Sequence, residues 1–399
     1  MVKKKNLLLG ESRFGIGHLS ICSKLIQVFD CPTTFATATN IPPNIFDFSQ
    51  VEIFRLPGID TNEHINQSAS LLYTHVKGQN YASVCLETWP FGRRGFDNIY
   101  EPTLKYLMHC GVRIYTSIRD ILYPNINPLC PFIEIWAREI IDKIRKYNIR
   151  VLVHGDENFI DFGKGFPLAK ELKKEDRLHY TGYLSIDSSL KKESTRNYKE
   201  NILVTAGSGK VGMSLYKMVL AGIGKGYFDD YTVLIVAGPW LNKNSFITLR
   251  EFEKSYSNLR VESSRRENGI FQNINVSISQ SGYGTSSNIL TNFKNHLNES
   301  SHLPVTPILV PWSDKSNPAV PHKLKPYLKQ DGLTEQELRA KVLASNGLGI
   351  FLQPGELTIK SLAESVIHTL SNPLASKDIG YFPKIATPGI LSRLDSLKP

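Results

Sequence analysis

The side chains of this sequence that could do chemistry gather at glycine-rich turns that follow short apolar segments. The first turn is Gly15-Ile16-Gly17-His18, directly before an amphipathic segment. Small residues at such a turn let backbone amides and the amino end of a helix approach an anion or a sugar closely. His18, at the start of the predicted helix, could act as a base or donate a hydrogen bond to a phosphate. A plain tight turn with a structural histidine is the alternative.

The second turn, GSGKVG at residues 207–212, has the G-x-G-x-x-G spacing of dinucleotide-binding proteins. That motif expects an acidic residue at the end of the next strand to hold the ribose. The next apolar segment, YTVLIVAG, ends instead in Gly238-Pro239. An NTPase phosphate loop is excluded as well, because Val204 and Val211 occupy the positions of its first glycine and its Ser/Thr. We interpret the segment as a glycine turn whose lysine can receive phosphates.

The third turn, SQSGYGTSSN at residues 279–288, lies between a predicted strand and a predicted helix. Hydroxyl and amide side chains crowd the amino end of that helix, where the helix dipole favours negative charge. The segment is therefore a second candidate site for a diphosphate, with simple helix capping as the alternative.

Strands must position these turns, and short apolar runs do alternate with longer amphipathic runs along the chain. Strands are predicted at residues 6–10, 33–37, 51–56, 83–87, 112–117, 150–154, 179–182, 201–206, 231–237, 259–262, 276–279, 306–310 and 348–352. Helices are predicted at residues 18–29, 63–78, 97–110, 132–147, 213–223, 286–295, 335–343 and 359–370. Such alternation predicts an α/β fold with parallel sheets covered by helices on both faces.

A polar segment, residues 186–200, divides the chain into two halves of similar size. The sequence predicts an N-terminal Rossmann-like domain at 1–185, a linker at 186–200 and a C-terminal Rossmann-like domain at 201–371. Residues 372–399 are predicted to form a tail that crosses back to the first domain.

The composition excludes several classes of protein. The 399 residues are 41% hydrophobic and 21% charged, which is typical of globular domains and not of disordered, collagenous or coiled-coil chains. Five cysteines without a CxxC pair indicate reduced thiols rather than a disulfide framework or a zinc site. No apolar run approaches the length of a secretory signal or of a membrane span. We expect a cytoplasmic protein, with peripheral contact to the inner face of the membrane left open.

The charge is unevenly distributed. The net charge of +10 comes from 47 basic and 37 acidic residues. Residues 1–190 contain 22 basic and 20 acidic residues, which leaves 25 and 17 for the rest of the chain. The excess is thus +2 in the first part and +8 in the second, which indicates an anionic ligand on the second domain rather than a uniformly basic nucleic-acid clamp.

Together, the motifs resemble those of GT-B glycosyltransferases of the MurG type and of related predicted bacterial glycosyltransferases. The resemblance rests on the order of the three turns and on four further segments: ETWPFGRR at 87–94, SIRDIL at 117–122, VHGD at 153–156 and YTGY at 180–183. It covers about residues 5–370 and implies two Rossmann-like domains that face a cleft. It also implies transfer of a sugar from a nucleoside-diphosphate donor, with a UDP-sugar expected, to the hydroxyl of a glycan, a lipid-linked or a small-molecule acceptor.

The resemblance places the donor mainly on the second domain. The donor-binding residues it implies are Gly15, Gly17, Gly207, Ser208, Gly209, Lys210, Ser281, Gly282, Tyr283, Gly284, Thr285, Asn288, Asp314 and Asn317. Two departures from the family pattern occur. Asn288 stands where a carboxylate holds the ribose, so that contact loses its charge assistance. The family also has a Gln-rich or Glu-Gln segment after the strand that ends in Val-Pro, and Asp314 and Asn317 are taken as its nearest equivalents.

Glycosyl transfer needs stabilisation of the leaving diphosphate and a base for the acceptor hydroxyl. Helix amino ends, Lys210 and the pair Arg265 and Arg266 could supply the first. His18 is the favoured base, and Glu87 and Asp156, at strand ends, compete with it.

Three further arginines, Arg93, Arg94 and Arg119, are candidates for contact with an anionic acceptor or a phosphate. No Asp-x-Asp pair occurs in the chain. We therefore expect no metal and no other cofactor, and, from the resemblance, inversion at the anomeric carbon.

Three alternatives remain open at this stage. The same scaffold could hydrolyse or 2-epimerise a nucleotide sugar. The charge of +10 would also suit a nucleic-acid-binding protein or a DNA-base glycosyltransferase. A dinucleotide-dependent dehydrogenase is the least favoured, because the acidic ribose ligand is missing.

Overall fold

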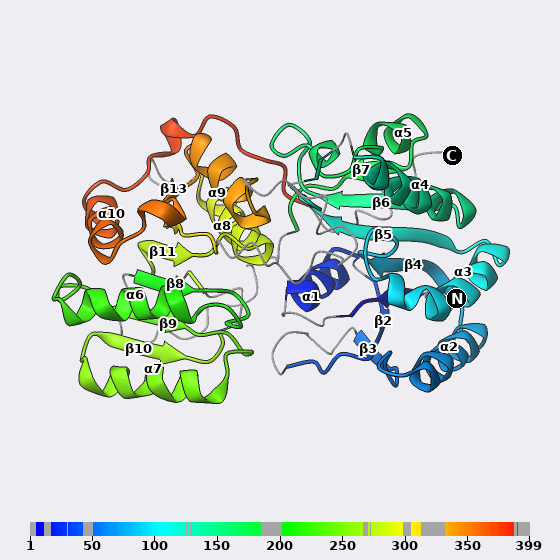
Figure 1. Cartoon of the computed structure of the whole chain (residues 1–399), viewed down its shortest axis with the longest axis horizontal. Coiled ribbons are helices and arrows are strands. Elements are labelled where there is room, and N and C mark those ends of the chain that lie inside the picture. Colours follow the sequence, from blue (N-terminus) through cyan, green and yellow to red (C-terminus); the bar gives the residue numbers. More distant parts are fainter. Residues whose placement is uncertain are drawn as a thin grey trace.

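The protein is described here by a computed structural model that covers residues 5–11, 17–29, 31–42, 51–124, 126–127, 130–184, 202–265, 270–271, 273–297, 305–312, 332–386 and 389. Within these ranges two parallel β-sheets, each with its own helices, lie next to each other (Figure 1). The predicted α/β fold class with two Rossmann-like domains is confirmed.

The first domain is a seven-stranded sheet in the order β3-β2-β1-β4-β5-β6-β7. Its elements are β1 (Lys5–Leu9), α1 (Gly17–Phe29), β2 (Thr33–Thr37), β3 (Val51–Arg55), α2 (Asn62–Lys77), β4 (Tyr81–Glu87), α3 (Asp97–His109), β5 (Arg113–Arg119), α4 (Pro131–Lys146), β6 (Ile149–His154), α5 (Ala169–Lys174) and β7 (Leu178–Tyr180). The sequence predicts all of these elements except the short α5.

The second domain is a six-stranded sheet in the order β10-β9-β8-β11-β12-β13. Its elements are β8 (Ile202–Thr205), α6 (Met213–Gly224), β9 (Val233–Val236), α7 (Lys243–Ser255), β10 (Leu259–Glu262), β11 (Val276–Ser279), α8 (Tyr283–His296), β12 (Thr306–Leu309), α9 (Glu335–Ser345), β13 (Ile350–Phe351) and α10 (Ile359–Ser371). Here the sequence misses α7, and it starts α8 three residues too late.

Alternation along the buried strands explains the layers. Leu7 and Leu9 of β1 pack with α2, α3 and α4, whereas Leu8 packs on the opposite face against α1. Strands buried on both faces read as continuous apolar runs, which is why these sheets are parallel and covered by helices on both sides. In β8, Leu203 joins the same core as Leu8, and that core includes residues of α1, α8 and α9. One apolar core therefore lies between the two sheets and joins the domains.

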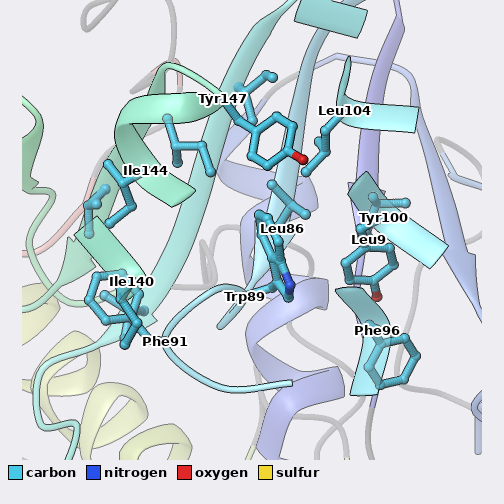
Figure 2. Packing of buried hydrophobic residues seen from close by; sticks show 14 of the residues in the cluster. Leu9, Leu86, Trp89, Phe91, Phe96, Tyr100, Leu104, Ile140, Ile144 and Tyr147 are labelled. Carbon is cyan, nitrogen blue, oxygen red and sulfur yellow. The ribbon is translucent and has the colours of Figure 1, made fainter. Parts of the chain in front are cut away.

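Trp89 anchors the segment that follows β4 in the core of the first domain. Its indole packs against the rings of Tyr100 and Tyr147 (Figure 2), and its Nε1 donates to Asp97 Oδ1 at 2.7 Å. The chain directly beyond Glu87 is thereby held in a fixed place.

The described part of the tail returns to the first domain. Ile385 forms a parallel bridge with Tyr183, and the Tyr381 hydroxyl and the Lys384 amide donate to Asp156 Oδ2 at 2.7 and 2.9 Å. Among the described helices, none has the length and hydrophobicity needed to cross a bilayer.

Candidate functional site

His18 and Glu87 form a hydrogen-bonded pair at the carboxyl edge of the first sheet. His18 lies in the first turn of α1, and Glu87 is the last residue of β4. His18 Nδ1 is 2.6 Å from Glu87 Oε1. Because an ionised carboxylate only accepts hydrogen bonds, this contact places the proton on Nδ1 and leaves the lone pair of a neutral ring on Nε2. The sequence treats these two residues as rival bases, and the structure joins them.

The surroundings of Glu87 keep it ionised. Burial alone would raise the pKa of Glu87, but the charge that His18 carries at acidic pH, the charge of Arg93 and hydrogen bonds from His18 and Thr88 lower it to about 2. The Thr88 hydroxyl donates to Oε1 at 2.6 Å. The second oxygen, Oε2, is buried and has no hydrogen-bond donor among the described residues. Among the described residues, the cation beside Oε2 is Arg93, whose Nη2 is 3.8 Å away.

His18 is held in its neutral form at pH 7. Burial lowers the pKa of His18 below its ordinary value of 6.5, and the positive charges of Arg93 and Arg119 lower it further, against the opposing effect of Glu87. The imidazole side chain still exposes 19% of its surface. A neutral, partly exposed imidazole oriented by a carboxylate can accept a proton from a substrate hydroxyl.

The segment after β4 also carries two of the predicted arginines. Arg93 has a left-handed backbone (φ 64°), and its Nη2 donates to the carbonyl oxygen of Glu11 at 2.5 Å. Arg94 starts the 3₁₀ turn Arg94–Phe96, and its side chain lies outside the described part. The Arg93 guanidinium therefore contacts protein groups, beside the Glu87 oxygen that His18 does not use.

One glycine of the second turn, Gly209, and one after β9, Gly238, are required by close backbone packing. A Cβ at Gly209 would lie 2.1 Å from the carbonyl oxygen of Ala237, and one at Gly238 would lie 2.3 Å from the carbonyl carbon of Ser208. Both glycines have positive φ, 85° and 87°. The turn after β8 is thus packed against the end of β9, with Lys210 exposed beside it.

Gly207 faces the third turn. Its φ is 63°, and a Cβ there would lie 4.0 Å from Thr285 Oγ1. Gly282 and Gly17 have no atom within 4 Å of a built Cβ. The structure therefore brings the second and third turns together, with open space at Gly17 and Gly282.

The amino end of α8 offers unpaired hydrogen-bonding groups. Gly282 precedes the helix without a side-chain cap, so the first amides of α8 have no acceptor within the helix. The hydroxyls of Ser281 and Ser286 are buried and have no partner among the described residues. Tyr283 turns away, since its ring stacks on Tyr183 and its hydroxyl accepts the amide of Leu184 at 3.2 Å.

Asn288 contacts the first domain. Lys24, fully buried on α1, donates to Asn288 Oδ1 at 2.6 Å, to Ser287 Oγ at 3.3 Å and to the carbonyl oxygen of Gly284 at 3.3 Å. The side chain expected to hold a ribose is thus engaged by a lysine that sequence analysis does not single out.

Arg119 pairs across the domain boundary with Glu335, the first residue of α9, at 3.2 Å. Glu335 also accepts from Arg339 at 2.8 Å. Burial alone would raise the pKa of Glu335, but the positive charges of Arg119 and Arg339, and that of His18 when it is protonated, lower it below its usual range. Glu335 is therefore within electrostatic reach of His18, and both domains contribute charges to one site.

A buried ion pair lies behind Glu335. Arg339 is fully buried and contacts Asp120 through two hydrogen bonds of 2.9 and 2.6 Å. It also donates to the carbonyl oxygen of Ser281 at 2.9 Å. The Tyr183 hydroxyl donates to Asp120 Oδ2 at 2.9 Å. This network fixes the start of α8 and of α9 against the end of β5.

Asp156, the third predicted base, lies apart from the pair. Its carboxylate accepts from Tyr381, from the amide of Lys384 and from the amide of Asn158. These contacts tie the tail and the turn after β6 together and give Asp156 a structural explanation.

Replacing Asp156 with alanine should therefore lower the stability by about 1–3 kcal/mol, because buried amide and hydroxyl donors lose their acceptor. Limited proteolysis should cut the tail faster in this variant. The kcat of the folded variant should stay within about tenfold of wild type; a loss of kcat like that expected of a general base would restore Asp156 as a candidate.

Some predicted residues fall outside the described part of the chain: Gly15, Arg266, Asp314 and Asn317. Residues that sequence reasoning misses are Lys24, Asp120, Glu335, Gln336 and Arg339. The pair Glu335-Gln336 carried a signal, because a Glu-Gln pair is what the resemblance implies after the Val-Pro strand. It begins the first described helix after β12, and Gln336 Oε1 accepts the Trp312 amide at 2.8 Å. The other three act across the domain boundary, and no local pattern marks them.

Solved structures that resemble the protein share its architecture over nearly the whole chain. The glycotransferase of kitacinnamycin has a TM-score of 0.57 at 11% identity and covers 98% of both chains. SnogD from Streptomyces nogalater, a glycosyltransferase, has a TM-score of 0.54 at 11% identity over 99% of both chains.

A third structure is Os79 from O. sativa, in complex with UDP and deoxynivalenol-3-glucoside. It has a TM-score of 0.51 at 13% identity, over 92% of this chain and 90% of that one. The 399-residue chain therefore has the GT-B fold. No family model and no curated protein matches the sequence.

Proposed function

We propose that the protein is a glycosyltransferase that moves a sugar from a nucleoside-diphosphate donor to an acceptor hydroxyl. The observation that carries the proposal is the His18–Glu87 pair in a chain of GT-B fold. The pair provides a neutral imidazole, oriented and partly exposed, at the edge where the two domains meet.

In the proposed reaction, His18 Nε2 takes the proton of the acceptor hydroxyl while its oxygen attacks the anomeric carbon. The bond between that carbon and the diphosphate oxygen breaks, and its electron pair leaves with the nucleoside diphosphate. Glu87 stabilises the imidazolium that forms, as the carboxylate of a hydrolytic triad does. Attack opposite the leaving group inverts the anomeric carbon, and the absence of an Asp-x-Asp pair from the sequence supports a route without a metal.

The donor diphosphate is proposed to bind at the amino end of α8. The uncapped amides, the hydroxyls of Ser281 and Ser286, and Thr285 supply donors, and the turn at Gly207 approaches from the opposite side. Lys210 and the excess of +8 in the second part of the chain favour a diphosphate electrostatically. A UDP-sugar is the proposed donor, which the UDP bound to Os79 supports.

A thermal-shift panel of nucleoside diphosphates and their sugars, in the presence of EDTA, tests the donor site. UDP at about one hundred times its Kd should raise the melting temperature by about 5 °C or more. Gly207→Val, which would crowd Thr285, should remove the shift, whereas Lys225→Ala at the exposed end of α6 should keep it. No response of the wild type to any nucleoside diphosphate would overturn the donor assignment.

Activity should fall only at acidic pH. His18 must be neutral to accept a proton, and its folded pKa lies below 6.5. We therefore expect kcat/KM to be constant from pH 7 to pH 8 and to fall tenfold per unit below the His18 pKa. An acid limb with its midpoint above pH 7 would contradict a neutral, buried His18 as the base.

A further inference from the structure

Arg93 lies beside the His18–Glu87 pair and contacts two protein groups in the described part of the chain. Its Nη2 is bonded to the carbonyl oxygen of Glu11 and is 3.8 Å from Glu87 Oε2, the carboxylate oxygen that neither His18 nor Thr88 uses. The Arg93 side chain exposes only 12% of its surface. An acceptor or a phosphate would have to displace these contacts to bind there.

The segment that carries Arg93 is held at both ends. The Thr88 amide donates to the carbonyl oxygen of Ser117 at 2.8 Å, and the Gly92 amide donates to the carbonyl oxygen of Thr88 at 3.0 Å. The Phe96 amide donates to the carbonyl oxygen of Arg93 at 2.9 Å. Glu11, whose carbonyl oxygen accepts the hydrogen bond from Arg93, is held in place as well.

Glu11 follows β1, and its carboxylate accepts the amide of Ala38 and the hydroxyl of Thr39 at 2.5 and 2.6 Å. The guanidinium is thus placed by the ends of β1, β2 and β4.

We propose that Arg93 is a positioning residue: its guanidinium holds Glu87 from the side opposite His18, and so keeps the imidazole neutral and oriented for proton transfer. This inference rests on the proposed function and adds a role that sequence analysis, which offers Arg93 as an acceptor contact, does not give.

The positive charge of Arg93 explains how this residue would act on both Glu87 and His18. Glu87 Oε2 is buried without a hydrogen bond among the described residues, so the cation beside it compensates a carboxylate that burial would otherwise protonate. The same cation opposes a second positive charge on His18. Among the described residues, the charged and titratable groups that interact with the pair are Arg93, Arg119, Glu335, Glu11, Cys22, Cys85, Tyr100 and His154.

The test uses two variants that separate charge from hydrogen bonding. Arg93→Lys keeps the charge, and Arg93→Gln keeps a donor for the Glu11 carbonyl but loses the charge. The titration of the His18 ring is followed by NMR in the full-length protein, with its resonance among the ten histidines assigned from His18→Asn. We expect Arg93→Gln to raise the His18 pKa by about 0.5–1 unit, and Arg93→Lys to leave it within about 0.2 units.

Activity provides the second readout. In Arg93→Gln the acid limb of kcat/KM should move up with the NMR pKa, while the acceptor KM changes less than about twofold. An unchanged His18 titration would overturn the proposal. If the acceptor KM also rises about tenfold, Arg93 is an acceptor contact instead.

If Arg93→Gln does not fold, Arg93→Met carries the same expectation. Because NMR reports on His18 without turnover, failure of the positioning role is distinguishable from failure of the proposed transferase activity.

Discussion

Replacing His18 with alanine should lower kcat by about 10²–10⁴-fold, the range that a positioned general base contributes. The reason is geometric. His18 Nδ1 is bonded to the buried, ionised Glu87, and the imidazole is partly exposed where the two domains meet. Alanine has no atom that could accept the proton of the acceptor hydroxyl in place of Nε2.

The loss should not extend to donor binding, because the proposed diphosphate site lies at the amino end of α8, so the affinity for a nucleoside diphosphate should change little. The stability should fall by about 1–3 kcal/mol, since the buried Glu87 carboxylate loses the hydrogen bond from His18. His109→Ala, an exposed histidine in the last turn of α3, is the matched control and should retain full activity. Glu87→Gln should resemble His18→Ala in kcat, since an amide cannot stabilise the imidazolium. A His18→Ala variant with a kcat within tenfold of wild type would remove His18 from the mechanism.

Replacing Arg339 with methionine should lower the free energy of unfolding by about 3–5 kcal/mol, the usual cost of leaving one partner of a buried ion pair unpaired. Asp120 is fully buried and receives two hydrogen bonds from Arg339. Without them its charge would be compensated among the described residues only by the Tyr183 hydroxyl and the Ile121 amide. The carbonyl oxygen of Ser281, at the start of α8, would lose its donor as well.

Denaturant unfolding followed by circular dichroism measures this loss. Arg138→Met is the control, because Arg138 pairs with Glu171 on the surface, where ion pairs contribute less than about 1 kcal/mol. The double variant Arg339→Met/Asp120→Leu should recover most of the stability, since it removes both charges together. Equal effects of Arg339→Met and Arg138→Met would show that the buried pair does not hold the domains together.

The fold was largely predictable because its signals are local. Ile133, Ile140, Ile141 and Ile144 recur at helical spacing, and all are buried on α4. Continuous apolar runs such as Leu7 to Leu9 mark strands covered on both faces.

The errors have local causes too. In α7 only Leu249 is buried, so its periodicity is weak. The first turn of α8 contains Gly284 and polar residues, which are typical of loops.

The site was predictable only in part, because its contacts join distant residues. His18 and Glu87 are 69 positions apart, and they meet because β1 and β4 are neighbours in the sheet. The sequence identifies both as candidates without indicating that they pair. Lys24 with Asn288 and Asp120 with Arg339 are separated by 264 and 219 positions and lie on different domains. Such pairs depend on how the domains pack, which no periodicity or motif specifies.

Acceptor-dependent turnover tests the central claim most directly. The protein is incubated with UDP-glucose, UDP-galactose or UDP-N-acetylglucosamine, with and without a mixture of phenolic, sugar and lipid-linked alcohols. UDP release and mass spectra are recorded, with His18→Ala as the inactive control. We predict that UDP release depends on an acceptor and that the mass of a new glycoside appears. NMR of this product should show an anomeric configuration inverted relative to the donor. Acceptor-independent formation of free sugar or of an epimer, at a rate that acceptors do not change, would contradict the account.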